Sequence, residues 1–216
     1  MDAVPNPEME VSSVVQFLVD AVETEGIRFS LDIDRAAVVA WDTETTSLHG
    51  VAIQIGVVAL DVEGRELLAT SRILSPLGYP IDPRAFAVHG IPQERLEEEG
   101  EPAGKCVSSL VDLASRATSA SVHFVAHNSA FDIRAIRKTA DAAGVSFPSS
   151  FSSFCTMNAG KRAMEAVGRG SKRPKNGELY EALVGPVPKE TILHDAVGDA
   201  RLTAHSFLAG RRVGLW

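Results

Sequence analysis

Cysteine and long apolar runs are both scarce in this sequence of 216 residues. The two cysteines, Cys106 and Cys155, form no CxxC pair, which does not favour a disulfide framework or a cysteine-rich zinc site. No apolar run approaches the roughly 20 residues that a membrane-spanning helix needs. The acidic N-terminus also lacks the basic and apolar regions of a signal peptide. We therefore expect a cytoplasmic protein in a reducing environment, with no membrane partner.

Positive charge is also in short supply, since the formal net charge is −7 at pH 7. Taken alone, this net charge argues against a nucleic-acid partner. The acidic excess lies in residues 1–34, which hold eight acids and one base, whereas residues 35–216 hold 20 of each. Residues 161–175 carry six basic side chains and one acid. Because a polyanion responds to a local patch more than to the total charge, the loop at 168–175 within this stretch is a candidate phosphate-binding loop, with a solvated loop as the alternative.

Hydrophobic patterning predicts a mixed-sheet α/β domain. Residues 36–42 form the continuous apolar run of a buried strand, and 51–60 and 66–74 are β-rich segments joined by a hairpin signal. Apolar residues at spacings of three and four predict an amphipathic helix over 8–25. Strands that come first and then alternate with helices are typical of this class. The other expected elements are strands at 121–126 and 151–155, short helices within 83–99, and helices at 105–118, 129–143, 156–167, 178–184 and 195–209.

Asp42 and Glu44 stand where acidic residues are unexpected, at the end of the first apolar strand. Side chains alternate along a strand, so these two carboxylates face the same way and repel each other. A divalent metal ion is the usual source of the compensating charge. A solvated strand end and a helix cap are the alternative interpretations.

Two further acidic positions lie next to predicted helix starts. Asp132 falls in the first turn of the helix that Asn128 or Ser129 caps, where its charge also stabilises the helix dipole. His194 and Asp199 are five residues apart and do not share a face of one helix. They converge only if His194 precedes the helix and Asp199 lies on it. Asp195 is then the expected N-cap.

Taken in this order, the three motifs resemble the DEDDh (DnaQ-like) family of 3′-5′ exonucleases. The motifs are the DxE at 42–44, the HNSAFD at 127–132 and the HDAVGD at 194–199, and the resemblance spans residues 37–209. It is supported by the VHGIP at 88–92 and the ELYEAL at 178–183. Residues 45–47 and Cys155 depart from the pattern of many relatives without removing a metal ligand. The resemblance implies a ribonuclease H-like fold, which is a five-stranded mixed sheet flanked by helices. It places an exonuclease domain at 36–212 after an acidic helical extension at 1–35.

The resemblance also implies hydrolysis with two Mg²⁺ or Mn²⁺ ions, which suit oxygen ligands. Asp42, Glu44 and Asp199 are then the ligands of the ion that carries the attacking water, and Asp42 bridges to the second ion. Asp132 acts through water. His194 is the expected general base, because imidazole exchanges protons near neutral pH, and a capping histidine is the alternative.

Contacts to the substrate are implied around these residues. Thr43, Thr45 and Thr46 are expected to hold the terminal 3′ hydroxyl, and Leu48 to wedge against the terminal base. The remaining candidates are contacts to the sugar-phosphate by Asn128 and Phe131, a place in the site wall for His89, and contacts to upstream phosphates by Arg169, Lys172 and Arg173. A helix cap, a core aromatic and a turn histidine are the alternative interpretations of Asn128, Phe131 and His89.

The expected activity is release of nucleoside monophosphates from single-stranded or frayed 3′ ends, with DNA favoured slightly over RNA. A proofreading exonuclease docked on a DNA polymerase is an alternative, in which residues 8–25 form a docking or homodimer helix. An RNA-trimming exoribonuclease is another. A helix that packs on the domain's own core is the slightly favoured interpretation of residues 8–25. A nuclease-fold binding module without catalysis is not favoured, because all five motif residues are intact.

Overall fold

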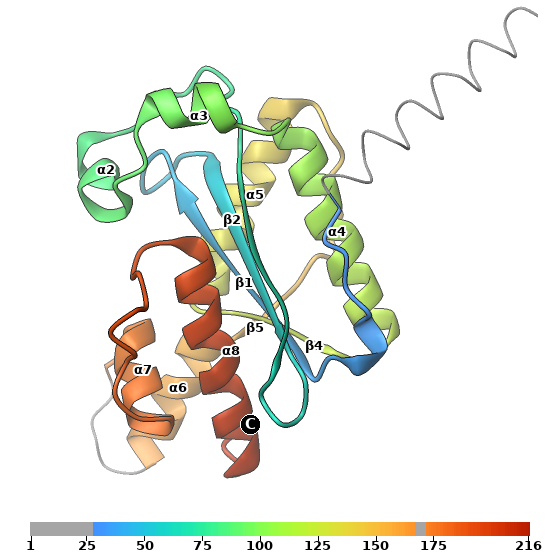
Figure 1. The fold of residues 1–216 in the computed structure, drawn as a ribbon, viewed down its shortest axis with the longest axis vertical. Helices are drawn as coiled ribbons and strands as arrows, with labels where there is room; N and C mark the ends of the chain where they lie inside the picture. Colours follow the sequence, from blue (N-terminus) through green and yellow to red (C-terminus); the bar gives the residue numbers. More distant parts are fainter. Residues whose placement is uncertain (1–27, 167–171) are drawn as a thin grey trace, which may run out of the picture.

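A five-stranded mixed sheet forms the centre of the protein, for which a computed structural model describes residues 28–166 and 172–216 (Figure 1). Its strand order is β3-β2-β1-β4-β5. β1 pairs antiparallel with β2 and parallel with β4, which confirms the predicted fold class. The strands are β1 (Val38–Thr45), β2 (Ala52–Leu60), β3 (Glu66–Ile73), β4 (His123–Ala126) and β5 (Phe154–Cys155).

Helices cover both faces of this sheet. α4 and α5 lie on one side, and α8 packs on the other with α6 and α7 beside it (Figure 1). The predicted helix over 8–25 lies outside the described residues. The helices are α2 (Pro83–His89), α3 (Gln93–Glu99), α4 (Ala103–Ser119), α5 (Ser129–Ala143), α6 (Thr156–Ala166), α7 (Asn176–Leu183) and α8 (Ala196–Arg212), with a 3₁₀ turn, η1 (Ile33–Arg35), before β1.

β1 continues three residues further than its apolar run predicts. Asp42, Thr43 and Glu44 all pair with β2, so the two carboxylates lie inside the strand and not beyond its end. The ladder hydrogen bonds to β2 extend the strand where side-chain hydropathy no longer indicates one. Asp42 and Glu44 are therefore held by a rigid part of the backbone.

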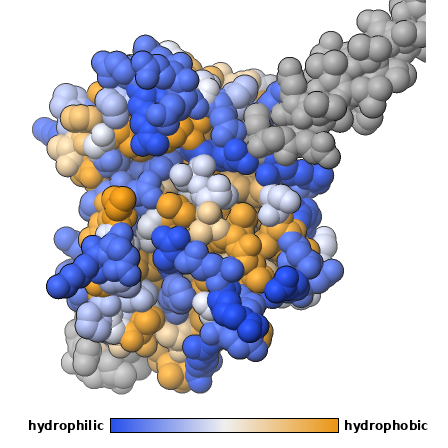
Figure 2. Space-filling view, viewed as in Figure 1, coloured by the Kyte–Doolittle hydropathy of each residue, from blue (hydrophilic) through white to orange (hydrophobic). Residues whose placement is uncertain are grey.

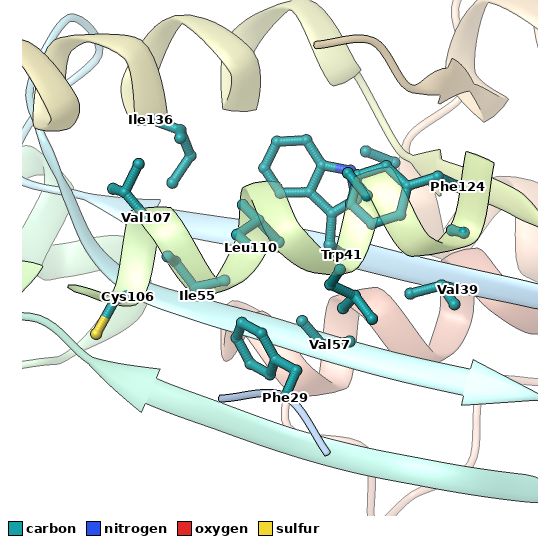
Figure 3. Packing of buried hydrophobic residues seen from close by; sticks show 14 of the residues in the cluster. Phe29, Val39, Trp41, Ile55, Val57, Cys106, Val107, Leu110, Phe124 and Ile136 are labelled. Atoms are coloured by element: carbon teal, nitrogen blue, oxygen red, sulfur yellow. The ribbon is translucent and has the colours of Figure 1, made fainter. Parts of the chain in front are cut away.

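The two faces of β1 belong to different layers of the core. Trp41 packs with the side chains of α4 and α5 and stacks on Phe124, with 5.7 Å between ring centroids (Figure 3). Val38 and Ala40 pack against α8 instead. Since alternate residues share a face, Asp42 and Glu44 continue the face that α8 covers.

Residues 28–35 contribute to the same core. Phe29 is 1% exposed and packs among the residues of α4. The Arg116 guanidinium donates to the carbonyl groups of Phe29 and Leu31. The part of the predicted 1–35 extension that the structure describes is therefore tied to the domain.

The outer surface is mixed in character. Figure 2 shows hydrophilic residues over α3 at the top of the view and hydrophobic residues gathered over the sheet in the middle. β3 is the edge strand there, and most of its residues are only half-buried. None of the helices within residues 28–166 and 172–216 combines the length and the apolar character that a membrane-spanning segment requires.

Candidate active site

Four carboxylates from three elements meet at one place, and we call Asp42, Glu44, Asp132 and Asp199 the acidic cluster. Asp42 and Glu44 come from β1, Asp132 from the first turn of α5 and Asp199 from the first turn of α8. Ligand atoms of Glu44, Asp199 and His194 all lie within 4.8 Å of one another. The structure thus brings together all five residues of the predicted motifs.

The acidic cluster carries strong mutual repulsion. Burial and then the neighbouring charge of Asp199 raise the pKa of Glu44 to about 8. Burial raises the pKa of Asp42 well above its ordinary value, and the surrounding carboxylates add to this effect. Within residues 28–166 and 172–216, the main charged groups that act on Asp42 and Glu44 are carboxylates. Buried like charges of this kind are stable together only as protonated acids or around a cation.

Only one of the two carboxylate oxygens of Asp132 has hydrogen-bond partners among the described residues. Its side chain is buried, and its Oδ1 accepts hydrogen bonds from the backbone N–H of Thr43 at 3.2 Å and from the Thr43 hydroxyl at 2.8 Å. Its Oδ2 is buried and has no hydrogen-bond partner among the described residues. Burial raises the pKa of Asp132 to about 7. A buried carboxylate oxygen without a partner is costly, and water or a cation supplies what this oxygen lacks.

Asp199 is oriented from both sides by neutral donors. Its Oδ2 accepts from the backbone N–H of His194 at 2.8 Å, and its Oδ1 accepts from Asn176 Nδ2 at 3.3 Å. Asn176 also donates to the backbone carbonyl of Asp199 at 2.8 Å and accepts from the Thr203 hydroxyl at 3.2 Å. Neutral donors fix the carboxylate while leaving its charge available to a cation.

His194 precedes α8, as predicted. Its backbone is left-handed, with φ of 59°, and its side chain is 59% exposed. Nδ1 lies 4.0 Å from Asp199 Oδ2. The predicted N-cap of α8 is confirmed, since Asp195 Oδ2 accepts from the backbone N–H of Gly198 at 3.4 Å. The imidazole is therefore at the edge of the acidic cluster and open to solvent.

A pocket of about 600 Å³ opens beside Glu44. Leu48, which is 70% exposed, Phe131 and His89 line it together with Thr45. His89 Nδ1 accepts from the backbone N–H of Ile91 at 3.0 Å, as expected of a turn histidine, while its buried Nε2 has no hydrogen-bond partner in the described parts of the chain. Burial lowers the pKa of His89, which keeps the ring neutral. The predicted wedge, aromatic and histidine thus share one pocket.

The remaining threonine and asparagine candidates make local contacts. The Thr45 hydroxyl donates to the carbonyl of Ser47, and the Thr46 hydroxyl accepts from the backbone N–H of Val51, so both close the turn between β1 and β2. Asn128 takes the N-cap position of α5 in a left-handed backbone, with φ of 63°, and its side chain makes no capping hydrogen bond. The roles of these residues toward substrate stay predictions.

The structure describes the basic loop at 168–175 only from residue 172 onward. Arg169 lies outside the described residues. Lys172 is exposed and pairs with Glu178 of α7 at 2.9 Å, which offsets its charge, and Arg173 is exposed. His127 holds the end of this segment, with 3.0 Å between its Nε2 and the carbonyl oxygen of Pro174. The predicted phosphate contacts of this segment stay predictions.

Sequence reasoning missed two polar residues that fix α8. Asn176 orients Asp199, and Gln54 binds the first residues of α8 from β2. The only signal for Gln54 is its place inside an otherwise apolar strand. Asn176 follows the basic segment and gives no comparable signal.

Comparisons with known proteins agree with this geometry. The RNase_T exonuclease family model matches residues 39–207. No curated protein sequence matches the chain. Exonuclease X in complex with 5′ overhanging duplex DNA is similar in structure, at 24% identity and a TM-score of 0.57, covering 83% of this chain and 93% of that one. The nuclease domain of 3′hExo, a DEDDh family member bound to rAMP, matches with 12% identity and a TM-score of 0.64, covering 82% and 92%. S. pombe Pop2p in its Mg²⁺- and Mn²⁺-bound form matches with 17% identity and a TM-score of 0.57, covering 93% and 90%.

Proposed function

Since the chain belongs to the DEDDh family of 3′-5′ exonucleases, with a ribonuclease H-like fold, we propose that it releases nucleoside monophosphates from single-stranded or frayed 3′ ends. The acidic cluster carries this proposal, because buried carboxylates surrounded by carboxylates stay ionised together only around cations. Oxygen donors of this kind suit Mg²⁺ or Mn²⁺, and Pop2p has been described with both ions bound. Asp42, Glu44 and Asp199 would hold the ions, with Asp132 acting through water at its unpartnered oxygen. When bound, two such ions supply an activated water and stabilise charge on the leaving oxygen.

The side chains around the acidic cluster would accept a proton, orient Asp199 and bind the terminal nucleoside. His194, exposed at its edge, takes a proton from the attacking water at an imidazole nitrogen. Asn176 and the backbone N–H of His194 hold Asp199 in one orientation. The pocket lined by Leu48 and Phe131 accepts the terminal nucleoside, because its apolar walls open directly beside Glu44.

We favour DNA slightly over RNA as the substrate. Exonuclease X, described with duplex DNA, shares 24% of its residues with this chain, against 12% for 3′hExo, described with rAMP. Lys172 and Arg173, which are both exposed, would contact phosphates upstream of the 3′ end. A cytoplasmic location is part of the proposal, and docking on a polymerase or a homodimer through residues 8–25 stays a prediction.

A digestion assay with matched DNA and RNA oligonucleotides tests the proposal. Each oligonucleotide carries a label at its 5′ end, so that removal of single nucleotides from the 3′ end gives a ladder of shortened products. We expect this ladder with Mg²⁺ or Mn²⁺ and no products with EDTA, and faster digestion of DNA. Cleavage that persists in EDTA, or internal cuts in place of a ladder, would contradict the proposed activity.

A further inference from the structure

Gln54 has a buried side chain, and both its amide nitrogen and its amide oxygen form hydrogen bonds with the start of α8. It is 1% exposed. Its Nε2 donates to Asp195 Oδ1 at 2.7 Å, and its Oε1 accepts from the backbone N–H of Ala196 at 3.0 Å. Chemistry fixes the orientation of the amide, because an ionised carboxylate only accepts and an N–H only donates. Glutamate at position 54 would set its carboxylate against that of Asp195. Leucine would leave Asp195 Oδ1 and the backbone N–H of Ala196 without these hydrogen bonds.

The register of the sheet connects this contact to the acidic cluster. Gln54 lies directly across from Glu44, and Gly56 lies directly across from Asp42. Gln54 and Gly56 share the face of β2 that meets α8. A Cβ atom at Gly56 would lie 2.1 Å from the carbonyl carbon of Ala196, so only glycine permits this close approach. Each carboxylate of β1 is thus paired with a β2 residue that touches the first turn of α8.

Asp195 connects Gln54 to Asp199 through hydrogen bonds. Its side chain caps the helix, and its backbone carbonyl accepts from the N–H of Asp199 at 3.0 Å. A hydrogen bond from Gln54 therefore fixes the residue that begins the turn on which Asp199 lies. The same side chain holds the next residue, Ala196, by its backbone.

We propose that Gln54 is a positioning residue, which sets Asp199 on α8 at its distance from Glu44 on β1 by hydrogen bonding the N-cap of α8. The inference rests on the proposed metal-dependent nuclease function and adds a determinant that lies outside the acidic cluster. A glutamine that serves only to pack α8 predicts something different. Its loss would lower the melting temperature but leave the metal affinity and kcat of the folded protein unchanged.

A double-mutant cycle in the full chain tests this role. In Q54E two carboxylates meet, and in D195N one amide hydrogen faces another donor. In the double variant the amide of residue 195 donates to the carboxylate of residue 54, so both hydrogen bonds return with one reversed in direction. We expect Q54E to lower kcat by about 10- to 100-fold, because a misplacement of about 1 Å can cost about 10²-fold. The half-saturating Mn²⁺ concentration, read from the rise in melting temperature, should increase several-fold, and both quantities should recover toward wild type in the double variant.

A glutamine-to-glutamate change outside the acidic cluster and the pocket beside Glu44 serves as the control. Gln93→Glu sets a carboxylate near Glu97 on α3 and should leave kcat and Mn²⁺ affinity unchanged. A double variant no better than Q54E in both quantities would overturn the role, as would a Q54E that loses only melting temperature. If Q54E does not fold, the double variant must exceed D195N in kcat and Mn²⁺ affinity, and a failure to do so overturns the role as well. A wild-type chain without metal-dependent cleavage would refute the proposed function, while the Mn²⁺ titration would still test Gln54.

Discussion

At the scale of single residues, the acidic cluster lowers the stability of the folded protein when no cation is bound. Burial and repulsion raise the pKa values of Glu44 and Asp132 to about 8 and about 7. Glu44→Gln and Asp42→Asn keep the shape of each side chain and remove one charge. We expect each variant to lose about 10³-fold or more in kcat. The reason is that bound metal ions stabilise charge in the transition state by several kcal/mol, and losing that stabilisation slows the reaction by such a factor. In EDTA each should melt at a higher temperature than wild type.

Single-turnover cleavage in saturating Mg²⁺ and calorimetry in EDTA measure these two effects. Asp141→Asn removes an exposed carboxylate from α5 and serves as the matched control, with normal activity and melting temperature. Near-normal cleavage by either cluster variant would refute its assignment as a metal ligand.

His194 calls for a different substitution, because its backbone is left-handed. Asparagine tolerates this conformation better than alanine does, and it cannot accept the proton. The hydrogen bond from the backbone N–H of residue 194 to Asp199 persists in either variant. We expect His194→Asn to bind Mn²⁺ normally and to lose about 10²- to 10⁴-fold in kcat, the usual range for a positioned proton acceptor. Normal single-turnover cleavage with a lowered melting temperature would instead indicate a capping histidine.

At the scale of elements, alternation along β1 is the part of the site that the sequence could predict. The apolar residues Val38 and Ala40 precede the two carboxylates at the same spacing, and they pack on α8 as that pattern requires. Hydropathy predicts that the strand ends at residue 42, because it does not detect the ladder hydrogen bonds that carry β1 to Thr45.

Contacts between distant elements could not be predicted in the same way. Gln54 and Asp195 are 141 residues apart, and Asn176 meets Asp199 across 23 residues. Hydrophobic patterning indicates which face of an element is buried, but not which polar group it will meet. The left-handed backbone of His194 is likewise set by the turn into α8 and by its hydrogen bond to Asp199.

The segment before α7 yields a prediction about substrate binding. Lys172 is partly neutralised by Glu178, so Glu178→Gln should strengthen phosphate binding and lower KM. Neutralising Arg169, Lys172 and Arg173 together should raise KM and flatten its salt dependence, with little change in kcat. Steady-state kinetics over a range of salt concentrations measures both effects. An unchanged salt slope in the triple variant would mean that this segment does not touch phosphate.

At the scale of the whole molecule, the acidic cluster joins the sheet to the helices on both of its faces, because its carboxylates come from β1, α5 and α8. β1, α5 and α8 each contribute a carboxylate, so a cation bound there would hold both layers to the sheet. A ligand that binds only the folded state stabilises it in proportion to the logarithm of its concentration. The stability of the whole domain should therefore report the charge state of the cluster.

The last prediction concerns how this stability depends on pH. The folded protein raises the pKa of Glu44 from 4.5 to about 8 and that of Asp132 from 3.8 to about 7, so it retains protons that the unfolded chain has lost. The free energy of unfolding must then fall as pH rises through this interval. In EDTA we expect the melting temperature to decline between about pH 5 and pH 8, whereas saturating Mg²⁺ should abolish the decline, because the cation replaces the protons. Glu44→Gln should flatten the profile in EDTA. A wild-type profile that is flat or rising in EDTA would show that these carboxylates are already compensated within the protein.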